Sequence, residues 1–260
     1  MNQPKRILAT GALGVIGSRI LPVLSQEFSI KYTDLKPGAL DGAPVETCDL
    51  LDFERLNTLA QGCDTILHLA IASGRDFERE APADNEIASF DTATIRVGCE
   101  GTFHILEAAR RNNIRRVVFM SSLTVIKGHS RNDISNNPTL SNKPSNLYAT
   151  TKIFGEHLGE LYYRSYGIEF IALRLGQPYP IADKHDVKIR NFPEAQQLAT
   201  HIDDITECVR CALRTEIPYG VYPLASVGEQ FSLPVEKSRE IGYLPSYLFK
   251  LGGPEKIVSG

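Results

Sequence analysis

The chain has 260 residues, of which 42% are hydrophobic and 23% are charged, enough to bury one large apolar core. These values exclude a long repeat array and a disordered chain. The formal net charge is -3 and basic residues cluster no further than in pairs, so we expect no nucleic-acid partner. The first ten residues lack an apolar stretch long enough for a signal peptide or a membrane span, so we expect a cytoplasmic protein with no membrane partner.

Short apolar runs alternate with longer helical patterns along the first two thirds of the chain. The predicted strands are residues 6–9, 30–33, 45–48, 65–69, 117–121 and 170–175. The predicted helices are residues 15–27, 52–61, 87–112 and 148–166. This alternation predicts an α/β protein with a Rossmann-type doubly wound parallel sheet.

The pattern weakens after residue 175, where prolines are frequent and only residues 203–214 form a clear helical pattern. We therefore expect an NAD-binding Rossmann domain at residues 1–175. A small irregular C-terminal substrate lobe follows at residues 176–260, interleaved with the first part and not an independent domain. Residues 127–146, rich in Gly, Ser, Asn and Pro, are predicted to form a surface loop.

The five cysteines are an odd number in a chain that needs no disulfides to build a core, which indicates reduced thiols. Cys208 and Cys211 form a C-x-x-C pair, but the pair lies on a predicted amphipathic helix. Packing is therefore the favoured role, with redox or metal chemistry as the alternative. The histidines show no zinc-type spacing, so we predict no metal.

A glycine-rich loop, TGALGVIG, lies between the first predicted strand and the first predicted helix. Its first glycine allows a tight turn, its second lets the backbone approach a pyrophosphate, and its third lets the helix pack close to the sheet. The free N–H groups of the helix N-terminus then face the phosphates. The candidate cofactor residues of the loop are Gly11, Gly14, Val15, Ile16 and Gly17. The alternative is that these glycines serve only a turn.

Two acidic residues follow the second and third predicted strands. Asp34 is placed to accept hydrogen bonds from the adenosine ribose hydroxyls, and its charge would repel a 2′-phosphate, which favours NAD over NADP. Asp49 is a candidate for the adenine edge. The alternatives are a solvated turn aspartate for Asp34 and a helix cap for Asp49.

Tyr148 and Lys152 lie four residues apart at the start of a predicted helix, so their side chains share one face. A tyrosine that acts as a base near pH 7 needs its pKa lowered from about 10, and a nearby ammonium with the positive nicotinamide ring can supply this. Ser122 ends the fifth predicted strand, where its hydroxyl can fix the substrate oxygen whose proton Tyr148 takes.

Three further residues are candidates for substrate contacts. Arg190 could clamp a carboxylate or be a solvated loop residue. Gln177 could bond a sugar hydroxyl or serve the loop. Thr124 could line the pocket or pack.

The order of these motifs resembles the extended short-chain dehydrogenases/reductases of the NAD-dependent epimerase/dehydratase family. The resemblance spans about residues 5 to 215 and rests on the glycine loop, the two acids, His68-Leu69-Ala70, Gly101-Thr102, the Ser/Tyr/Lys set and His201-Ile202-Asp203-Asp204. It implies bound NAD and a catalytic triad of Ser122, Tyr148 and Lys152, with Lys152 also holding the nicotinamide ribose. It also implies that Asp49-Leu50 and Leu69-Ala70 lie along the cofactor.

Within that family the layout looks most like the uronate dehydrogenases, which oxidise the anomeric hydroxyl of a hexuronic acid. This likeness adds Ser73, after the fourth predicted strand, as a substrate contact. Two positions depart from the pattern. Leu123 stands where those enzymes carry an asparagine that contacts the sugar, and Gly98 stands where the wider family carries another asparagine.

The leading hypothesis is an NAD-dependent enzyme that oxidises a hydroxyl of a small sugar or sugar acid. The first alternative is a nucleotide-sugar epimerase or dehydratase with tightly bound NAD, although the short C-terminal part shows no cluster of arginines to grip a diphosphate. The second is a non-catalytic dinucleotide sensor, although the tyrosine and the lysine are both present. Apolar residues on more than one face of the two longest predicted helices also predict a homodimer.

Overall fold

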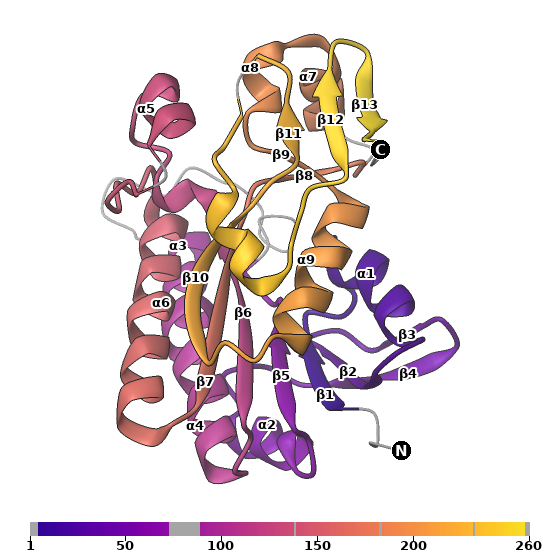
Figure 1. Cartoon of the computed structure of the whole chain (residues 1–260). Coiled ribbons are helices and arrows are strands. Elements are labelled where there is room, and N and C mark those ends of the chain that lie inside the picture. The colour runs from indigo at the N-terminus through magenta and orange to yellow at the C-terminus, as the bar shows by residue number, and fades with distance from the viewer. Residues whose placement is uncertain (1–4, 73–88, 138, 182–183, 231, 258–260) are drawn as a thin grey trace.

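The computed structural model describes residues 5–72, 89–137, 139–181, 184–230 and 232–257. At its centre is an eight-stranded sheet with the order β10-β7-β6-β5-β1-β2-β4-β3, in which every neighbouring pair is parallel except β3 with β4 (Figure 1). The strands are β1 (Arg6–Thr10), β2 (Ser29–Asp34), β3 (Gly38–Leu40), β4 (Ala43–Thr47), β5 (Thr65–His68), β6 (Arg116–Ser122), β7 (Glu169–Leu175) and β10 (Tyr219–Leu224).

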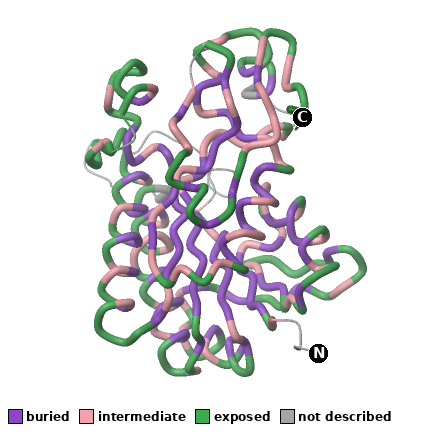
Figure 2. Tube along the Cα trace, in the orientation of Figure 1, coloured by how far each residue is buried: buried purple, intermediate pink, exposed green. Residues whose placement is uncertain are grey.

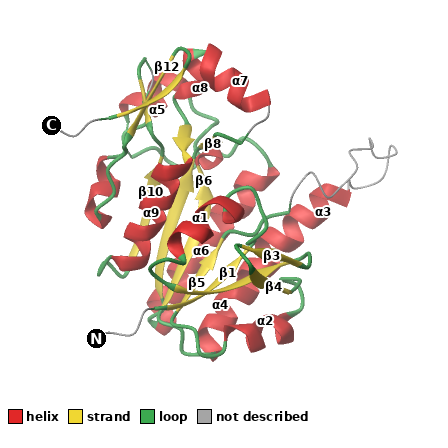
Figure 3. Cartoon of the chain, turned by 90° about the vertical axis from the view of Figure 1, so that its right-hand side faces the viewer, coloured by secondary structure: helices red, strands yellow, loops and turns green. Residues whose placement is uncertain are grey.

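Helices cover both faces of this sheet, which confirms the Rossmann-type α/β prediction (Figure 3). One face carries α2 (Phe53–Ala60), α4 (Thr102–Arg111) and α6 (Leu147–Tyr166), and the other carries α1 (Gly17–Leu24) and α9 (Ile202–Arg214). Strand β1 shows the alternation that builds two cores. Ile7 and Ala9 pack toward α1 and α9, whereas Leu8 packs toward α2 and α4. The central strands are accordingly buried along most of their length (Figure 2).

The six predicted strands are all present, with ends shifted by one or two residues. The third predicted helix is not continuous. It is divided into α3 (Ser89–Ile95), a π-helical turn η1 (Arg96–Gly101) and α4. Gly98 and Gly101 both lie in this wide turn, and glycine weakens the regular α-helix that the apolar spacing predicts.

The C-terminal part is more regular than the sequence predicts. Strand β8 (Gln177–Tyr179) pairs with β9 (Ala199–His201), and a second sheet contains β11 (Val227–Gly228), β12 (Tyr247–Lys250) and β13 (Gly253–Lys256). The short helices are α7 (Lys184–Asn191), α8 (Pro193–Gln196) and the 3-10 turn η3 (Glu236–Ile241). The frequent prolines led us to predict irregular structure, but they lie at positions where helices and strands tolerate proline. Pro223 lies in the edge strand β10, and Pro193 begins α8.

This part is joined to the rest of the chain through shared elements. Both β10 and α9 belong to the central layers, so residues after 175 complete the main sheet. Buried Asp204 of α9 accepts hydrogen bonds from the Ser226 hydroxyl and, at 2.6 Å, from the backbone N–H of Ser246. The predicted surface loop at residues 127–146 follows the 3-10 turn η2 (Leu123–Val125) and contains the short helix α5 (Arg131–Asn136). Among the described residues no helix is long and apolar enough to cross a membrane.

Candidate active site

The carboxyl ends of β1, β2, β5, β6 and β7 meet at one edge of the sheet, which is where ligands bind in open α/β folds. Two cavities lie there, one of about 450 Å³ along the glycine loop and one of about 1320 Å³. Val15, Ile16 and Leu69 line both cavities. A ligand with two parts can therefore extend from one cavity into the other.

Close backbone contacts shape the glycine loop. Gly11 has a φ of 71°, and a Cβ atom there would lie 2.7 Å from the backbone nitrogen of Ala70. A Cβ atom at Gly17 would lie 2.3 Å from the carbonyl oxygen of Gly11. Only glycine fits at these two positions. Gly14 is exposed and lines the smaller cavity, so its backbone is open to a ligand. This cradle at the N-terminal end of α1 fits the pyrophosphate of a dinucleotide.

Asp34 holds the glycine loop and also faces the smaller cavity. Its Oδ2 accepts a hydrogen bond from the backbone N–H of Leu13 at 2.9 Å, and its Oδ1 accepts one from the backbone N–H of Lys36 at 3.4 Å. Each carboxylate oxygen can accept a further hydrogen bond from a ribose hydroxyl. The turn role and the cofactor role predicted for Asp34 are therefore compatible.

Asp49 is exposed, and its Oδ1 accepts a hydrogen bond from the backbone N–H of Leu51 at 2.9 Å. The cap of α2 is Asp52, which accepts from the backbone N–H of Arg55 at 3.1 Å. The helix-cap alternative for Asp49 is therefore wrong. Asp49 instead begins a turn on the wall of the smaller cavity, where its carbonyl oxygen accepts a hydrogen bond from the backbone N–H of Asp52 at 3.0 Å.

Apart from Lys152, every residue predicted to contact the cofactor lines the smaller cavity: Gly11, Gly14, Val15, Ile16, Gly17, Asp34, Asp49, Leu50, Leu69 and Ala70. The sequence analysis missed other lining residues, including Leu13, Leu35 and Val97. Leu13 and Leu35 adjoin predicted residues and could have been found by extending each motif. Val97 could not, because it reaches the cavity from the π-helical turn.

Ser122 and Tyr148 line the larger cavity, and Lys152 is buried beside Tyr148. Asn146 begins α6 by accepting a hydrogen bond from the backbone N–H of Ala149 at 2.8 Å, and this fixes the first turn that carries Tyr148. Ser122 ends β6 and shares a hydrogen bond with the Tyr148 hydroxyl. Lys152 is buried, with its Nζ 5.5 Å from the centre of the Tyr148 ring and 4.7 Å from that of Phe119.

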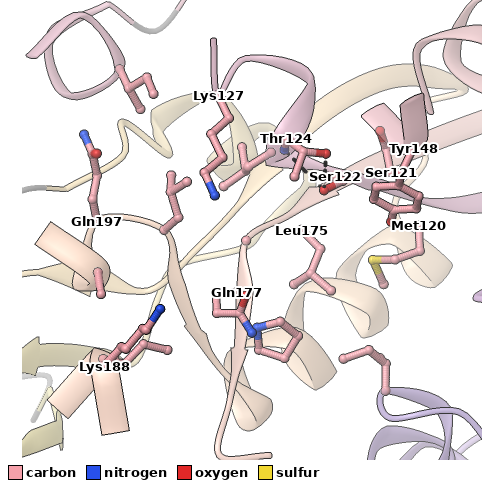
Figure 4. A pocket seen from close by; sticks show the side chains of 18 of the residues that line it. Met120, Ser121, Ser122, Thr124, Lys127, Tyr148, Leu175, Gln177, Lys188 and Gln197 are labelled. Atoms are coloured by element: carbon pink, nitrogen blue, oxygen red, sulfur yellow. Dashed lines mark hydrogen bonds between the residues drawn. The ribbon is translucent and has the colours of Figure 1, made fainter. Parts of the chain in front are cut away.

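Thr124 orients Ser122. The Ser122 Oγ accepts hydrogen bonds from the Thr124 hydroxyl at 2.9 Å and from the Thr124 backbone N–H at 3.2 Å (Figure 4). Because its oxygen accepts these bonds, the Ser122 proton is directed away from Thr124 and toward Tyr148 or a substrate oxygen. Thr124 also lines the larger cavity, the first of the two roles that the sequence analysis considered for it.

Burial shifts the pKa values of Tyr148 and Lys152 in opposite directions. It raises the pKa of Tyr148 to about 12, and the hydrogen bond with Ser122 opposes the rise. It lowers the pKa of Lys152 to about 7, and the charge of Glu156 opposes the fall. The side chains alone therefore keep Tyr148 protonated at neutral pH.

A buried polar network behind the site ties α6 to the sheet. Glu156 accepts a hydrogen bond from the Ser121 hydroxyl at 2.6 Å and two from the Arg174 guanidinium, at 2.9 and 2.7 Å. Arg174 also donates to the Asn142 side chain at 2.7 Å. The sequence analysis missed this network: the spacing of Glu156 one helical turn after Lys152 indicates only a shared helix face and does not reveal the partners on β6 and β7.

The predicted substrate residues have different outcomes. Gln177 lines the larger cavity, and Ser73 lies outside the described residues. Arg190 does not line the cavity. It is exposed, its Nε donates to the carbonyl oxygen of Asp186 at 3.4 Å, and its side chain lies near Gly253. Lys188, two residues earlier on α7, faces the cavity because residues two apart lie on nearly opposite faces of a helix.

The structure shows what surrounds Leu123 and Gly98, the two positions that depart from the family pattern. Leu123 is buried and packs with Val125, Ile134 and Leu233 beside the larger cavity, so this part of the wall is apolar. A Cβ atom at Gly98 would lie 2.5 Å from the Oγ1 of Thr151. The Thr151 side chain therefore fills the space that a larger residue at position 98 would need.

All five cysteines are free thiols. Cys208 is fully buried in the core between α9 and the sheet, and burial raises the pKa of both Cys208 and Cys211. This matches the packing role predicted for the pair. Among the residues that the structure describes, no group of three or more His, Cys, Asp or Glu could hold a metal ion.

The fold and this constellation define a dinucleotide-binding α/β protein with a serine, a tyrosine and a lysine at the carboxyl edge of its sheet. The sequence model of the NAD dependent epimerase/dehydratase family matches residues 7–192. The chain belongs to this family, whose members are NAD-dependent enzymes.

The relatives that this chain resembles include uronate dehydrogenases. The uronate dehydrogenase of Pseudomonas syringae pv. tomato is 32% identical over 182 residues, which cover 67% of this chain and 60% of that protein. The crystal structure of a glucuronic acid dehydrogenase from Chromohalobacter salexigens superposes with a TM-score of 0.76 and 27% identity, over 94% of this chain and 85% of the other. Uronate dehydrogenase from Agrobacterium tumefaciens gives a TM-score of 0.76 at 25% identity, over the same shares of the two chains.

Proposed function

We propose that the protein is an NAD-dependent dehydrogenase that oxidises a hydroxyl of a small sugar or sugar acid through Ser122, Tyr148 and Lys152. One observation carries this proposal: Tyr148 and Ser122 line the same cavity as Val15 and Ile16 of the glycine loop. A cofactor held by the loop would therefore present its reactive ring to the two hydroxyls. The similarity to uronate dehydrogenases supports a sugar-type substrate.

Each residue has a distinct part in the reaction. Ser122 donates its oriented proton to the substrate oxygen, and Tyr148 Oη takes the proton of the substrate hydroxyl. The ammonium form of Lys152 stabilises the tyrosinate from the same helix face. NAD+, when bound, would supply the hydride acceptor and a positive charge that favours the tyrosinate. The hydroxyl carbon loses a hydride and its oxygen loses a proton, so an alcohol becomes a carbonyl and a hemiacetal becomes a lactone.

Lys152 is also proposed to hold the nicotinamide ribose, and the residues lining the smaller cavity are proposed to hold the rest of the cofactor. The glycine cradle and Asp34 support this assignment. A cytoplasmic site of action fits the free thiols.

The direct test is turnover by Tyr148→Phe. This change keeps the ring that packs in the site and removes the only atom that takes the proton. We expect NADH formation to fall by at least about a thousandfold, at the upper part of the range for general acid–base groups, while NAD+ affinity stays within about twofold. Unchanged turnover would exclude Tyr148 as the base. Thr124→Val, which removes only the hydroxyl that orients Ser122, should cause a smaller loss.

The epimerase or dehydratase alternative predicts a different behaviour of the cofactor. Such an enzyme returns the hydride to its substrate and retains NAD through purification. A dehydrogenase releases NADH after each turnover. Measuring the nucleotide content of the purified protein distinguishes the two.

We also propose that the protein forms a homodimer through α3, α4 and α6, which pack side by side (Figure 1). These helices leave large apolar side chains exposed: Ile95, Phe103, Phe154, Leu161 and Tyr166. Burying such a patch against a second copy removes apolar surface from water. Sedimentation should give a dimer that Leu161→Glu converts to a monomer, and a wild-type monomer mass at all concentrations would contradict the proposal.

A further inference from the structure

The larger cavity has a cationic region separate from the Ser/Tyr/Lys set. Among the described residues, the formally charged side chains that line the cavity are Lys127, Arg131, Lys188 and Glu194, an excess of two positive charges for that part of the chain. Lys127 follows η2, Arg131 begins α5, and Lys188 lies on α7. Three separate elements therefore bring positive charge to one cavity.

Figure 4 shows how two of these groups lie relative to Tyr148. Lys127 and Lys188 project from opposite walls with their ammonium groups turned toward the cavity, across it from Tyr148. Leu175 and Gln177 lie between these lysines and the tyrosine. A substrate that reacts at Tyr148 would thus extend its other end toward the lysines.

These cations have no carboxylate partner among the described residues, where no ion pair includes Lys127, Arg131 or Lys188. The wall around them is nevertheless held in place. Gln197 is buried, and its Nε2 donates to the carbonyl oxygen of Arg131 and to the Ser135 hydroxyl, both at 2.7 Å. This tethers the start of α5 beside the cavity.

The net charge of the described cavity lining and the types of its cationic residues distinguish a phosphate ester from a carboxylate as the bound group. A phosphate ester carries about two negative charges at neutral pH, which matches the excess of two positive charges, whereas a carboxylate carries one. Lysine binds phosphate as a point charge, while planar carboxylates are best matched by the two-pronged guanidinium of arginine. Of the three described cations that line the cavity, two are lysines, and Figure 4 shows both turned toward it.

We propose that the substrate is a sugar phosphate, with its phosphate ester bound by Lys127 and Lys188 and its reacting hydroxyl at Tyr148. This inference rests on the proposed dehydrogenase function. The ester takes no part in bond making: the reacting hydroxyl loses its proton to Tyr148 and its carbon loses a hydride to NAD+, and the phosphate stays attached throughout.

The test compares three sugars that share one ring and one anomeric hydroxyl: glucose 6-phosphate, glucuronate and glucose, with the galactose series measured in parallel. We expect the highest kcat/KM for a 6-phosphate. Lys127→Gln and Lys188→Gln should each lower that value by about ten- to a hundredfold and leave the neutral sugar within about twofold. The control is Lys237→Gln, an exposed lysine outside the cavity lining, which should change neither value.

A binding measurement separates this inference from the proposed function. Titration calorimetry of the 6-phosphates into the Tyr148→Phe variant with NAD+ present needs no turnover. Binding that the lysine substitutions abolish supports the phosphate site even if no sugar is oxidised. If glucuronate is oxidised better than the 6-phosphates, or if the lysine substitutions leave sugar phosphate binding unchanged, the inference is overturned while the dehydrogenase proposal stands.

Discussion

Replacing Lys152 with methionine should stabilise the folded protein in the absence of NAD, even though it removes a residue needed for catalysis. Lys152 is only 3% exposed, and burial lowers its pKa from 10.5 to about 7. The unfolded chain keeps the ordinary pKa, so it binds a proton more tightly than the folded chain does. Methionine has a similar length and carries no charge.

The size of the effect follows from the difference between the two pKa values. Each pH unit between them corresponds to about 1.4 kcal/mol, so the ammonium form costs the folded chain about 5 kcal/mol at pH 7 and below. A group with a lowered pKa regains this stability as the pH rises. The advantage of Lys152→Met should therefore shrink above pH 7 and vanish near the ordinary pKa of 10.5.

Urea denaturation of both proteins at several pH values between about 6 and 10, without NAD, measures this difference directly. Other titrating groups are common to the two proteins and cancel in the comparison. Lys237→Met, at an exposed position, should show no such trend. A difference in the free energy of unfolding that does not change with pH, or a less stable variant, would refute the argument from burial.

Three other substitutions test the rest of the site. Asp34→Ser should raise the ratio of kcat/KM for NADP+ to that for NAD+ by at least about tenfold, because the carboxylate that repels a 2′-phosphate is gone; an unchanged ratio would assign Asp34 to the turn alone. Gly98→Ala should lower the free energy of unfolding by about 1–3 kcal/mol because its Cβ meets Thr151, and a neutral effect in thermal denaturation would show that the π-helical turn can adjust. Arg174→Met should cost about 3–5 kcal/mol by leaving Glu156 buried without its partner, and adding Glu156→Gln should recover part of that loss.

The sequence predicted the sheet well, and the residues that it assigned to the cofactor gather at one cavity, because both depend on local chemistry. The glycine loop is dictated by contacts within a few residues of each strand end, so its spacing is visible in one dimension. The same holds for Ser122, which ends a buried strand, and for Tyr148 and Lys152, which lie one helical turn apart.

The residues that line the larger cavity were harder to predict because they come from distant segments. Arg190 and Lys188 are separated by one residue and lie on nearly opposite sides of α7. The rotation of this helix about its axis therefore decides which of them faces the cavity, and the sequence does not reveal it. Lys127 lines the same cavity as Lys188, but it comes from a loop for which the sequence predicted only a surface position. Charge pairing across such distances, as between Glu156 and Arg174, leaves no periodic signal in the sequence.

The π-helical turn was missed for a related reason. The apolar spacing of residues 87–112 fits an α-helix, and the position of the wide turn depends on how Gly98 meets Thr151 of α6. Such a contact between two helices is a tertiary effect that overrides local propensity.

The central claim is that the glycine loop and Tyr148 act together on a free sugar derivative. The most direct measurement is NADH absorbance when the purified protein and NAD+ are mixed with uronates, neutral aldoses, aldose phosphates and nucleotide-diphosphate sugars. We expect one class of free sugar derivative to reduce NAD+, and we expect Tyr148→Phe to abolish that signal. Silence with every compound, from protein that retains NAD through purification, would contradict the dehydrogenase account and favour an internal redox cycle.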